Sequence, residues 1–168
     1  KNFIFLENMK THQIVFISLF IILVSCEQKT NSPFDTYFKE GTLRIDYFHA
    51  GNATSESVSL DKMYKYDQWA GSLVNLIDSL NYGAYSYKIY DLASSKLIYS
   101  HGFDSYFKEY QVSTPAIEGT IKQFHESAII PIPSQKIIFA LEKRNKDGKL
   151  DEVFRTEIDP SVTQIQLM

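Results

Sequence analysis

The one cysteine of the chain has neighbours that suit covalent lipidation. Cys26 follows Leu23, Val24 and Ser25, which fits the lipobox pattern of an aliphatic residue, a small or aliphatic residue, a small residue and cysteine. The modest side chains at Val24 and Ser25 leave the extended backbone open to a signal peptidase. Cleavage between Ser25 and Cys26 would free an amine for acylation, and the Cys26 thiol would carry a diacylglyceryl group. The sequence therefore predicts a bacterial lipoprotein signal with Cys26 as the lipidation site.

The residues before Cys26 have the layout of a secretory signal. Lys10 precedes a mostly apolar run of 11 residues, Ile14–Val24. Such a run makes a helix of roughly 16 Å, whereas a bilayer core of about 30 Å needs about 20 residues. We therefore expect residues 9–25 to be a cleaved signal peptide and residues 1–8 to be an upstream extension. The alternative is an uncleaved short hydrophobic anchor with an incidental cysteine.

His125 and Glu126 begin like the HExxH motif of zinc proteases, but Ile129 stands where the second histidine belongs. Zinc in such sites needs three protein ligands and a water. The stretch also has the pattern of a strand, where residues i and i+4 are about 13 Å apart. We therefore interpret His125 as a side chain packed at a sheet edge and predict no metal site in the chain.

The acidic residues around Gly148 resemble a calcium-binding loop. Asp147 and Asp151 are suitably spaced, but Lys143 and Phe154 occupy the positions where an EF-hand places its first acid and its final glutamate. A hairpin turn built on Asp147 and Gly148 accounts for the same residues. We favour the turn.

Nothing else in the sequence forms a recognisable catalytic set. His49, His101 and His125 have no spacing to serine and aspartate that supports a triad, so we predict no catalytic residue. Tyrosine and tryptophan side chains suit stacking on sugars, but the same residues fill the cores of β-sandwiches.

The composition bounds the class of protein. The 142 residues after Cys26 are enough for one domain with a sizeable core. Loss of Lys1, Glu7 and Lys10 with the leader changes the net charge from −3 to −4, which argues against a nucleic-acid surface. Because Cys26 is the only cysteine, no disulfide forms within the chain. The 12 phenylalanines and 11 tyrosines favour strands.

Alternation of apolar and polar residues indicates a mainly β fold. It predicts extended segments over residues 41–47, 56–64, 85–90, 97–100, 117–130, 136–144, 150–158 and 162–167. Turn residues pair four of these segments into two hairpins, 85–100 and 136–158. Pro131 and Pro133 place the segment before them at a sheet edge, because proline cannot donate to a central ladder.

Residues Asp67–Leu80 have a different pattern. Apolar side chains recur there at spacings of three or four, which predicts one short amphipathic helix, with Gly71 as an unfavourable residue inside it. We expect residues 26–34 to be a tether and residues 35–168 to be an antiparallel β-sandwich. The last alternating segment is interrupted at Met168, so we expect this domain to be truncated at its C-terminus.

An ordered series of segments resembles the N-terminal domain of the IgA-peptidase-type zinc metallopeptidases. The resemblance covers residues 34–168 and rests on Gly41–Tyr47, Trp69–Ser72, Asn75–Leu76, Tyr99–Phe103, Phe107–Tyr110, Phe124–Ser127, Pro131–Pro133 and Asp159–Pro160. It implies a noncatalytic β-sandwich followed by a separate domain that carries HExxH and zinc. The cofactor would then belong to that following domain and not to this chain.

Two functional readings follow. In the first, the chain is the accessory domain of a lipid-anchored peptidase, with the membrane, the downstream catalytic domain and a protein substrate as partners and no nucleic acid. In the second, it is a free-standing surface lipoprotein that binds glycan or protein. Glu27 follows Cys26 in place of the aspartate associated with inner-membrane retention, so we expect a cell-envelope protein in the outer membrane.

Overall fold

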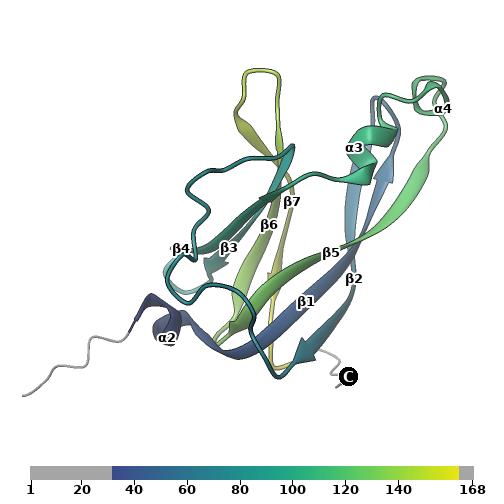
Figure 1. Cartoon of the computed structure of the whole chain (residues 1–168). Helices are drawn as coiled ribbons and strands as arrows, with labels where there is room; N and C mark the ends of the chain where they lie inside the picture. The colour runs from purple at the N-terminus through teal and green to yellow at the C-terminus, as the bar shows by residue number, and fades with distance from the viewer. Residues whose placement is uncertain (1–31, 163–168) are drawn as a thin grey trace, which may run out of the picture. The chain divides into compact units, whose positions relative to one another are not determined.

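A computed structural model describes residues 32–162 of the chain. Its strands are β1 Phe38–Gly51, β2 Glu56–Tyr66, β3 Tyr85–Asp91, β4 Leu97–Phe103, β5 Lys122–Pro133, β6 Ile137–Arg144 and β7 Leu150–Ile158. One antiparallel sheet has the order β2–β1–β5 and the other the order β4–β3–β6–β7 (Figure 1). The two sheets pack together, which confirms the predicted mainly β fold and antiparallel β-sandwich.

Three short helices lie outside the sheets in the described residues: α2 Pro33–Tyr37, α3 Tyr106–Tyr110 and α4 Thr114–Ile117. Helix α2 begins with a serine cap, because Ser32 Oγ accepts a hydrogen bond from the Asp35 amide at 3.1 Å. Phe34 of this helix is buried and its ring packs 5.8 Å from that of Phe38. Helix α2 therefore begins at Pro33, within the last residues of the expected tether.

The helix predicted over Asp67–Leu80 was wrong, because this segment is an irregular loop between β2 and β3. The side chains of Ser72 and Asp78 each accept hydrogen bonds from two backbone amides further along the loop, at 2.8 to 3.2 Å. Such local bonds compete with helical ones. Of the apolar side chains in the predicted stripe only Leu76 is buried, so no continuous apolar face is formed.

Both predicted hairpins are confirmed, as β3 pairs with β4 and β6 pairs with β7. In the second hairpin Asn145 Oδ1 accepts hydrogen bonds from the amides of Asp147 at 2.9 Å and Lys149 at 3.0 Å. Gly148 has a φ of +79°, which favours glycine at this position of the turn. Asp147 and Gly148 therefore lie in a tight turn, as the sequence predicted.

Strand β5 lies at the edge of its sheet, as Pro131 and Pro133 predicted. The expectation that the chain is extended from Ile117 was wrong for its first residues, because Thr114–Ile117 forms α4 and β5 begins only at Lys122. Pro115 lies in the first turn of α4, where its missing amide has no helical partner to lose.

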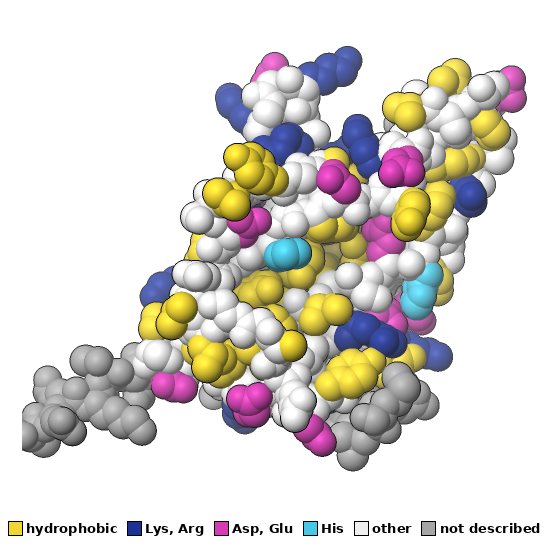
Figure 2. All heavy atoms as spheres, viewed as in Figure 1, with side chains coloured by type: hydrophobic (Ala, Val, Ile, Leu, Met, Phe, Trp, Pro, Cys, Tyr) yellow, Lys and Arg dark blue, Asp and Glu magenta, His cyan; other side chains and the backbone are white. Residues whose placement is uncertain are grey.

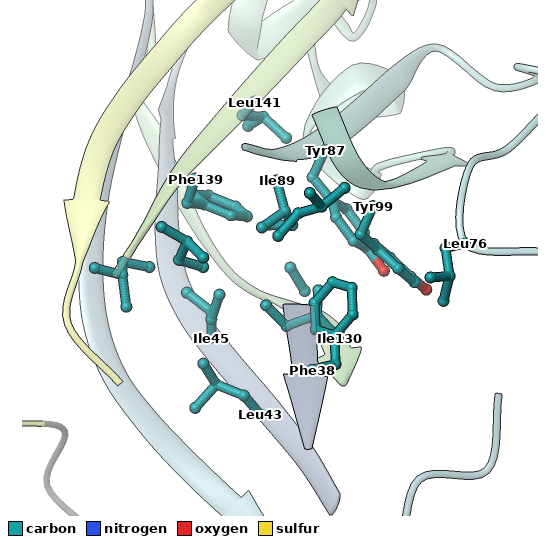
Figure 3. Packing of buried hydrophobic residues seen from close by; sticks show 14 of the residues in the cluster. Phe38, Leu43, Ile45, Leu76, Tyr87, Ile89, Tyr99, Ile130, Phe139 and Leu141 are labelled. Atoms are coloured by element: carbon teal, nitrogen blue, oxygen red, sulfur yellow. The ribbon is translucent and has the colours of Figure 1, made fainter. Parts of the chain in front are cut away.

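The core fills the space between the two sheets. Leu43, Ile45 and Tyr47 of β1 alternate inward and are fully buried, as the period of two predicted. Figure 3 shows how side chains from the facing sheets meet there, with Phe139 and Ile89 opposite Ile45 and Ile130. Close packing of this kind is the main stabilising contribution to the fold.

The predicted last strand, over residues 162–167, falls outside the described residues except for Val162, which lies in a turn. None of the helices in the described part of the chain has the length and apolarity needed to cross a bilayer.

Candidate functional site

A buried histidine lies between two carboxylates at one end of the sandwich interior. His49, near the end of β1, is fully buried. Its Nδ1 atom lies 3.0 Å from Oε2 of Glu126 on β5, and its Nε2 atom lies 2.8 Å from Oε1 of Glu56, the first residue of β2. Both ring nitrogens thus face acceptors, an arrangement that only the doubly protonated imidazolium satisfies in full.

Each carboxylate has further partners from other elements. Glu56 accepts a hydrogen bond from the Tyr85 hydroxyl of β3 at 2.9 Å and forms an ion pair with Lys143 of β6. Glu126 accepts a hydrogen bond from the Ser105 hydroxyl, just before α3. The network therefore links both sheets and the β4–β5 connection. We call it the His49 network, and its members are His49, Glu56, Glu126, Tyr85, Ser105 and Lys143.

Local structure fixes each of these positions. His49 continues the inward side of β1, two residues after Tyr47, so strand alternation directs it into the core. The Phe107 ring covers the imidazole with its centroid 4.1 Å away. Ser105 caps α3 by accepting the Phe107 amide at 3.0 Å, which also holds its hydroxyl toward Glu126.

The charges of the network shift one another's pKa values. Burial acts to lower the pKa of His49, but hydrogen bonds to Glu126 and Glu56 outweigh it, so the pKa is raised. Burial acts to raise the pKa of Glu56, but His49 and Lys143 outweigh it and lower the pKa to about 2. Burial also acts to raise the pKa of Glu126, but hydrogen bonds to His49 and Ser105 outweigh it, so the pKa is lowered.

The pH dependence of stability follows from these shifts. The lowered pKa of Glu56 stabilises the fold above its ordinary value of 4.5, by up to about 3 kcal/mol, and this contribution is lost as the pH falls toward about 2. The raised pKa of His49 stabilises the fold below its ordinary value of 6.5 and this contribution is lost as the pH rises through the folded-state value. We expect the free energy of unfolding, measured by urea titration, to be greatest at about pH 5 to 6.

The Glu56→Gln variant is the control for this profile, since other carboxylates also contribute to acid unfolding. Its stability should fall less steeply on the acid side than that of the unaltered chain. If the free energy of unfolding of the variant fell as steeply with acid as that of the unaltered chain, the assignment to Glu56 would be contradicted. If the free energy of unfolding of the unaltered chain did not decline on the alkaline side, the assignment to His49 would be contradicted.

The His49 network does not have the geometry of a metal or nucleophilic site. Glu56 and Glu126 contact opposite nitrogens of the ring, so their oxygens do not converge with it on one ion. The Ser105 hydroxyl donates to Glu126 and not to the imidazole, whereas a nucleophilic serine must be bonded to its base. Within residues 32–162 no group of three or more His, Cys, Asp or Glu side chains could hold a metal. The described residues therefore do not fit a zinc centre, and the network acts as a structural connection.

The residues singled out from the sequence lie apart from one another. Ser25 and Cys26 fall outside the described residues. His125 lies on the exposed side of β5, 3.0 Å from Asp61 and with its ring 5.0 Å from that of Phe48. Glu126 points inward from the same strand, so the two residues that resembled a zinc motif lie on opposite faces of one sheet.

A second feature is a cleft of about 390 Å³ beside the edge of β5. Aromatic side chains from β3, β4 and the β2–β3 loop line it: Trp69, Tyr87, Tyr99, His101 and Phe103. The Tyr87 hydroxyl donates to the Ile129 carbonyl at 3.0 Å and so joins the two sheets at this cleft. Figure 2 shows hydrophobic side chains within the hollow at the centre of this face. Tyr87 and Tyr99 are nearly buried, so Trp69, His101 and Phe103 offer the accessible surface.

Sequence reasoning missed the His49 network, although one signal was present. His49 and Glu126 are polar residues at positions that strand alternation assigns to the apolar face. A polar residue at such a position needs a buried partner. Which partner each one has depends on strand pairing, which the local pattern does not contain.

Fold and network together define a β-sandwich domain with a buried histidine between two carboxylates, one of which joins the facing sheet through Lys143 and Tyr85. A family model described as Peptidase M64 N-terminus matches residues 33–155, from the first residue of α2 into β7, and the chain belongs to this family. This confirms the resemblance found in the sequence. No curated protein matches the chain.

Proposed function

We propose that this chain is the noncatalytic N-terminal accessory domain of a lipid-anchored, secreted zinc metallopeptidase of the bacterial cell envelope. It holds the downstream peptidase domain, or the protein substrate of that domain, at a fixed distance from the outer membrane. The zinc belongs to the downstream domain. The observation that carries the proposal is the family match over residues 33–155.

The sequence before the matched region supports the anchor. Cys26 precedes Pro33 by seven residues, so a lipid on its thiol would lie within about 25 Å of the start of α2. A tether of this length keeps a folded domain close to the bilayer surface. Two or more acyl chains on Cys26 would anchor it stably, because each buried methylene contributes about 0.8 kcal/mol.

Replacing Cys26 by serine is expected to abolish lipidation and to release the protein from the membrane. Cells fed radiolabelled palmitate should label the unaltered chain but not the Cys26→Ser variant, which should move to the soluble fraction. The Ser25→Ala variant is the matched control, because it keeps a small residue before the cysteine and should be labelled normally. An unaltered chain that takes up no label would refute the anchor.

The accessory role is tested separately. The purified chain should not cleave casein, with or without added zinc, and the gene should continue past Met168 into a reading frame that encodes HExxH. Cleavage of casein that a chelator abolishes would show that this chain is itself a peptidase. A stop codon directly after Met168 would leave a free-standing lipoprotein.

The aromatic cleft favours a second candidate, a surface lipoprotein that binds glycan. Trp69, His101 and Phe103 offer accessible ring surface in a cleft that could accept a sugar. In affinity electrophoresis through polysaccharide gels, such a protein would be retarded and the Trp69→Ala variant would not. Equal mobility in gels with and without polysaccharide would remove this candidate.

A further inference from the structure

The loop between β2 and β3 exposes an unusual amount of apolar surface. Five of its side chains are between 43 and 77% exposed: Leu73, Val74, Ile77, Leu80 and Tyr82. Figure 2 shows hydrophobic side chains on the left of the visible face, where this loop runs in Figure 1. Large apolar side chains exposed together on one loop mark a site of interaction with a partner or a membrane. We call it the apolar loop, residues 67–84.

The apolar loop is held rigidly in this conformation. Leu76 is buried against the core and its carbonyl accepts the Ser100 amide of β4 at 3.0 Å. Asp78 accepts the Gly102 amide at 2.9 Å, while its own amide donates to the Ser100 hydroxyl at 2.9 Å. Arg144 donates to the Gly83 carbonyl at 2.9 Å and so fixes the far end. The exposed side chains are therefore presented outward by a fixed backbone.

The apolar loop lies beside α2, the first described element of the chain. Val74 and Ile77 line a groove of about 310 Å³ together with Pro33 and Tyr37 of α2. Lys96, in the same groove, places its ammonium group 5.2 Å from the Tyr37 ring. The last described residue, Val162, lies elsewhere, since it lines a different pocket with residues of β2 and β7.

We propose that the apolar loop docks on the surface of the lipid bilayer next to the anchor, with Leu73, Val74, Ile77, Leu80 and Tyr82 in its interfacial region. The inference rests on the proposed lipidation of Cys26, because the seven residues from Cys26 to Pro33 keep α2 and the adjacent loop within about 25 Å of the acyl chains. Apolar side chains with a nearby lysine suit this interface, where the ammonium group meets lipid phosphates. A second contact of this kind fixes the orientation of the domain, which a flexible tether alone does not.

Because lipidation blocks Cys26, the acylated chain offers a single reactive thiol when one cysteine is introduced. We would label Val74→Cys with an environment-sensitive fluorophore and bind the acylated protein to vesicles of phosphatidylethanolamine and phosphatidylglycerol. Ser57→Cys is the matched control, because Ser57 is exposed on β2 of the other sheet. On vesicles the emission of the Val74 label should shift to the blue. When the vesicles contain nitroxide-bearing lipids, the Val74 label should also be quenched. The Ser57 label should show neither effect.

The possible outcomes distinguish a failure of the loop contact from a failure of the lipid anchor. A Val74 label that stays in an aqueous environment on vesicle-bound, acylated protein overturns the inference and leaves the anchor intact. A label shielded before vesicles are added shows that a second copy or another domain covers the loop, which also overturns it. If the protein proves not to be acylated, the anchor fails. The loop contact is then tested on its own by placing the same Val74 label on the Cys26→Ser chain and adding excess vesicles. A blue shift of the emission supports the contact of the loop with lipid, and an unchanged emission overturns it.

Discussion

Replacing His49 by alanine is expected to lower the free energy of unfolding by about 3–5 kcal/mol, because it removes the cation between two partly buried carboxylates. Glu56 would keep its ion pair with Lys143 and its hydrogen bond from Tyr85. Glu126 would keep the Ser105 and Tyr47 hydroxyls as polar partners but would lose the positive charge that His49 places beside it. The cost of leaving that carboxylate without a charge partner should account for much of the effect.

The measurement is urea unfolding of the unaltered chain and the variant at the same pH. His125→Ala is the matched control, because His125 also lies 3.0 Å from a carboxylate, that of Asp61, but is half exposed on the outer face of β5. We expect the control to lose less than about 1 kcal/mol, since exposed ion pairs contribute little. Similar losses in the two variants would show that burial does not strengthen the His49 contacts.

A milder change keeps the prediction testable if His49→Ala fails to fold. The His49→Gln variant retains a polar side chain but carries no positive charge. Its stability should lie between those of the alanine variant and the unaltered chain, and the alkaline decline of the pH profile should disappear. A glutamine variant as stable as the unaltered chain, with the same pH profile, would mean that His49 is neutral in the fold.

The hairpins could be predicted because the information for them is local. In Ile137–Arg144 every second residue, Ile137, Phe139 and Leu141, is apolar and buried, and Asn145 and Gly148 supply the turn that returns the chain. Period-two alternation also assigned Leu43, Ile45 and Tyr47 to the buried face without any knowledge of the second sheet. Where neighbours in sequence decide the structure, the expected fold and the observed one agree.

The error over Asp67–Leu80 has a physical cause. Apolar spacing describes a helix face only if a surface is available to bury it, and here only Leu76 is buried, while Trp69 packs against the margin of the core. Ser72 and Asp78 bind backbone amides of the loop and so favour turns over a helix. Three residues of the predicted stripe, Leu73, Ile77 and Leu80, are left on the surface, where we propose that they contact lipid.

The His49 network could not be predicted from local pattern, because its members are brought together by strand pairing. His49 and Glu126 lie on neighbouring strands, where His49 is opposite Phe124 and Glu126 is opposite Tyr47. Glu56 reaches the other ring nitrogen only because β2 returns antiparallel from a tight turn after Gly51. Alternation could identify the inward polar residues, but not which of them meet.

Replacing Phe139 by alanine is expected to be as damaging as the loss of His49, with a decrease of about 3–5 kcal/mol in the free energy of unfolding. Phe139 is fully buried on β6 and its ring lies 6.2 Å from that of Tyr47 on the facing sheet. The truncated side chain leaves a cavity between two rigid sheets that cannot close over it, so packing is lost as well as apolar burial.

Phe48→Ala is the control for the loss of a phenyl ring, because Phe48 lies on the outer side of β1 and its ring contacts the exposed His125 ring. Cross-strand pairs on such a face contribute up to about 1 kcal/mol, so we expect a loss of that size in urea unfolding. The difference between the two variants tests the assignment of faces, since a register shift of one residue on either strand would exchange inward and outward positions. If Phe48→Ala proved the more damaging of the two, the packing of the sheets described here would be wrong at its centre.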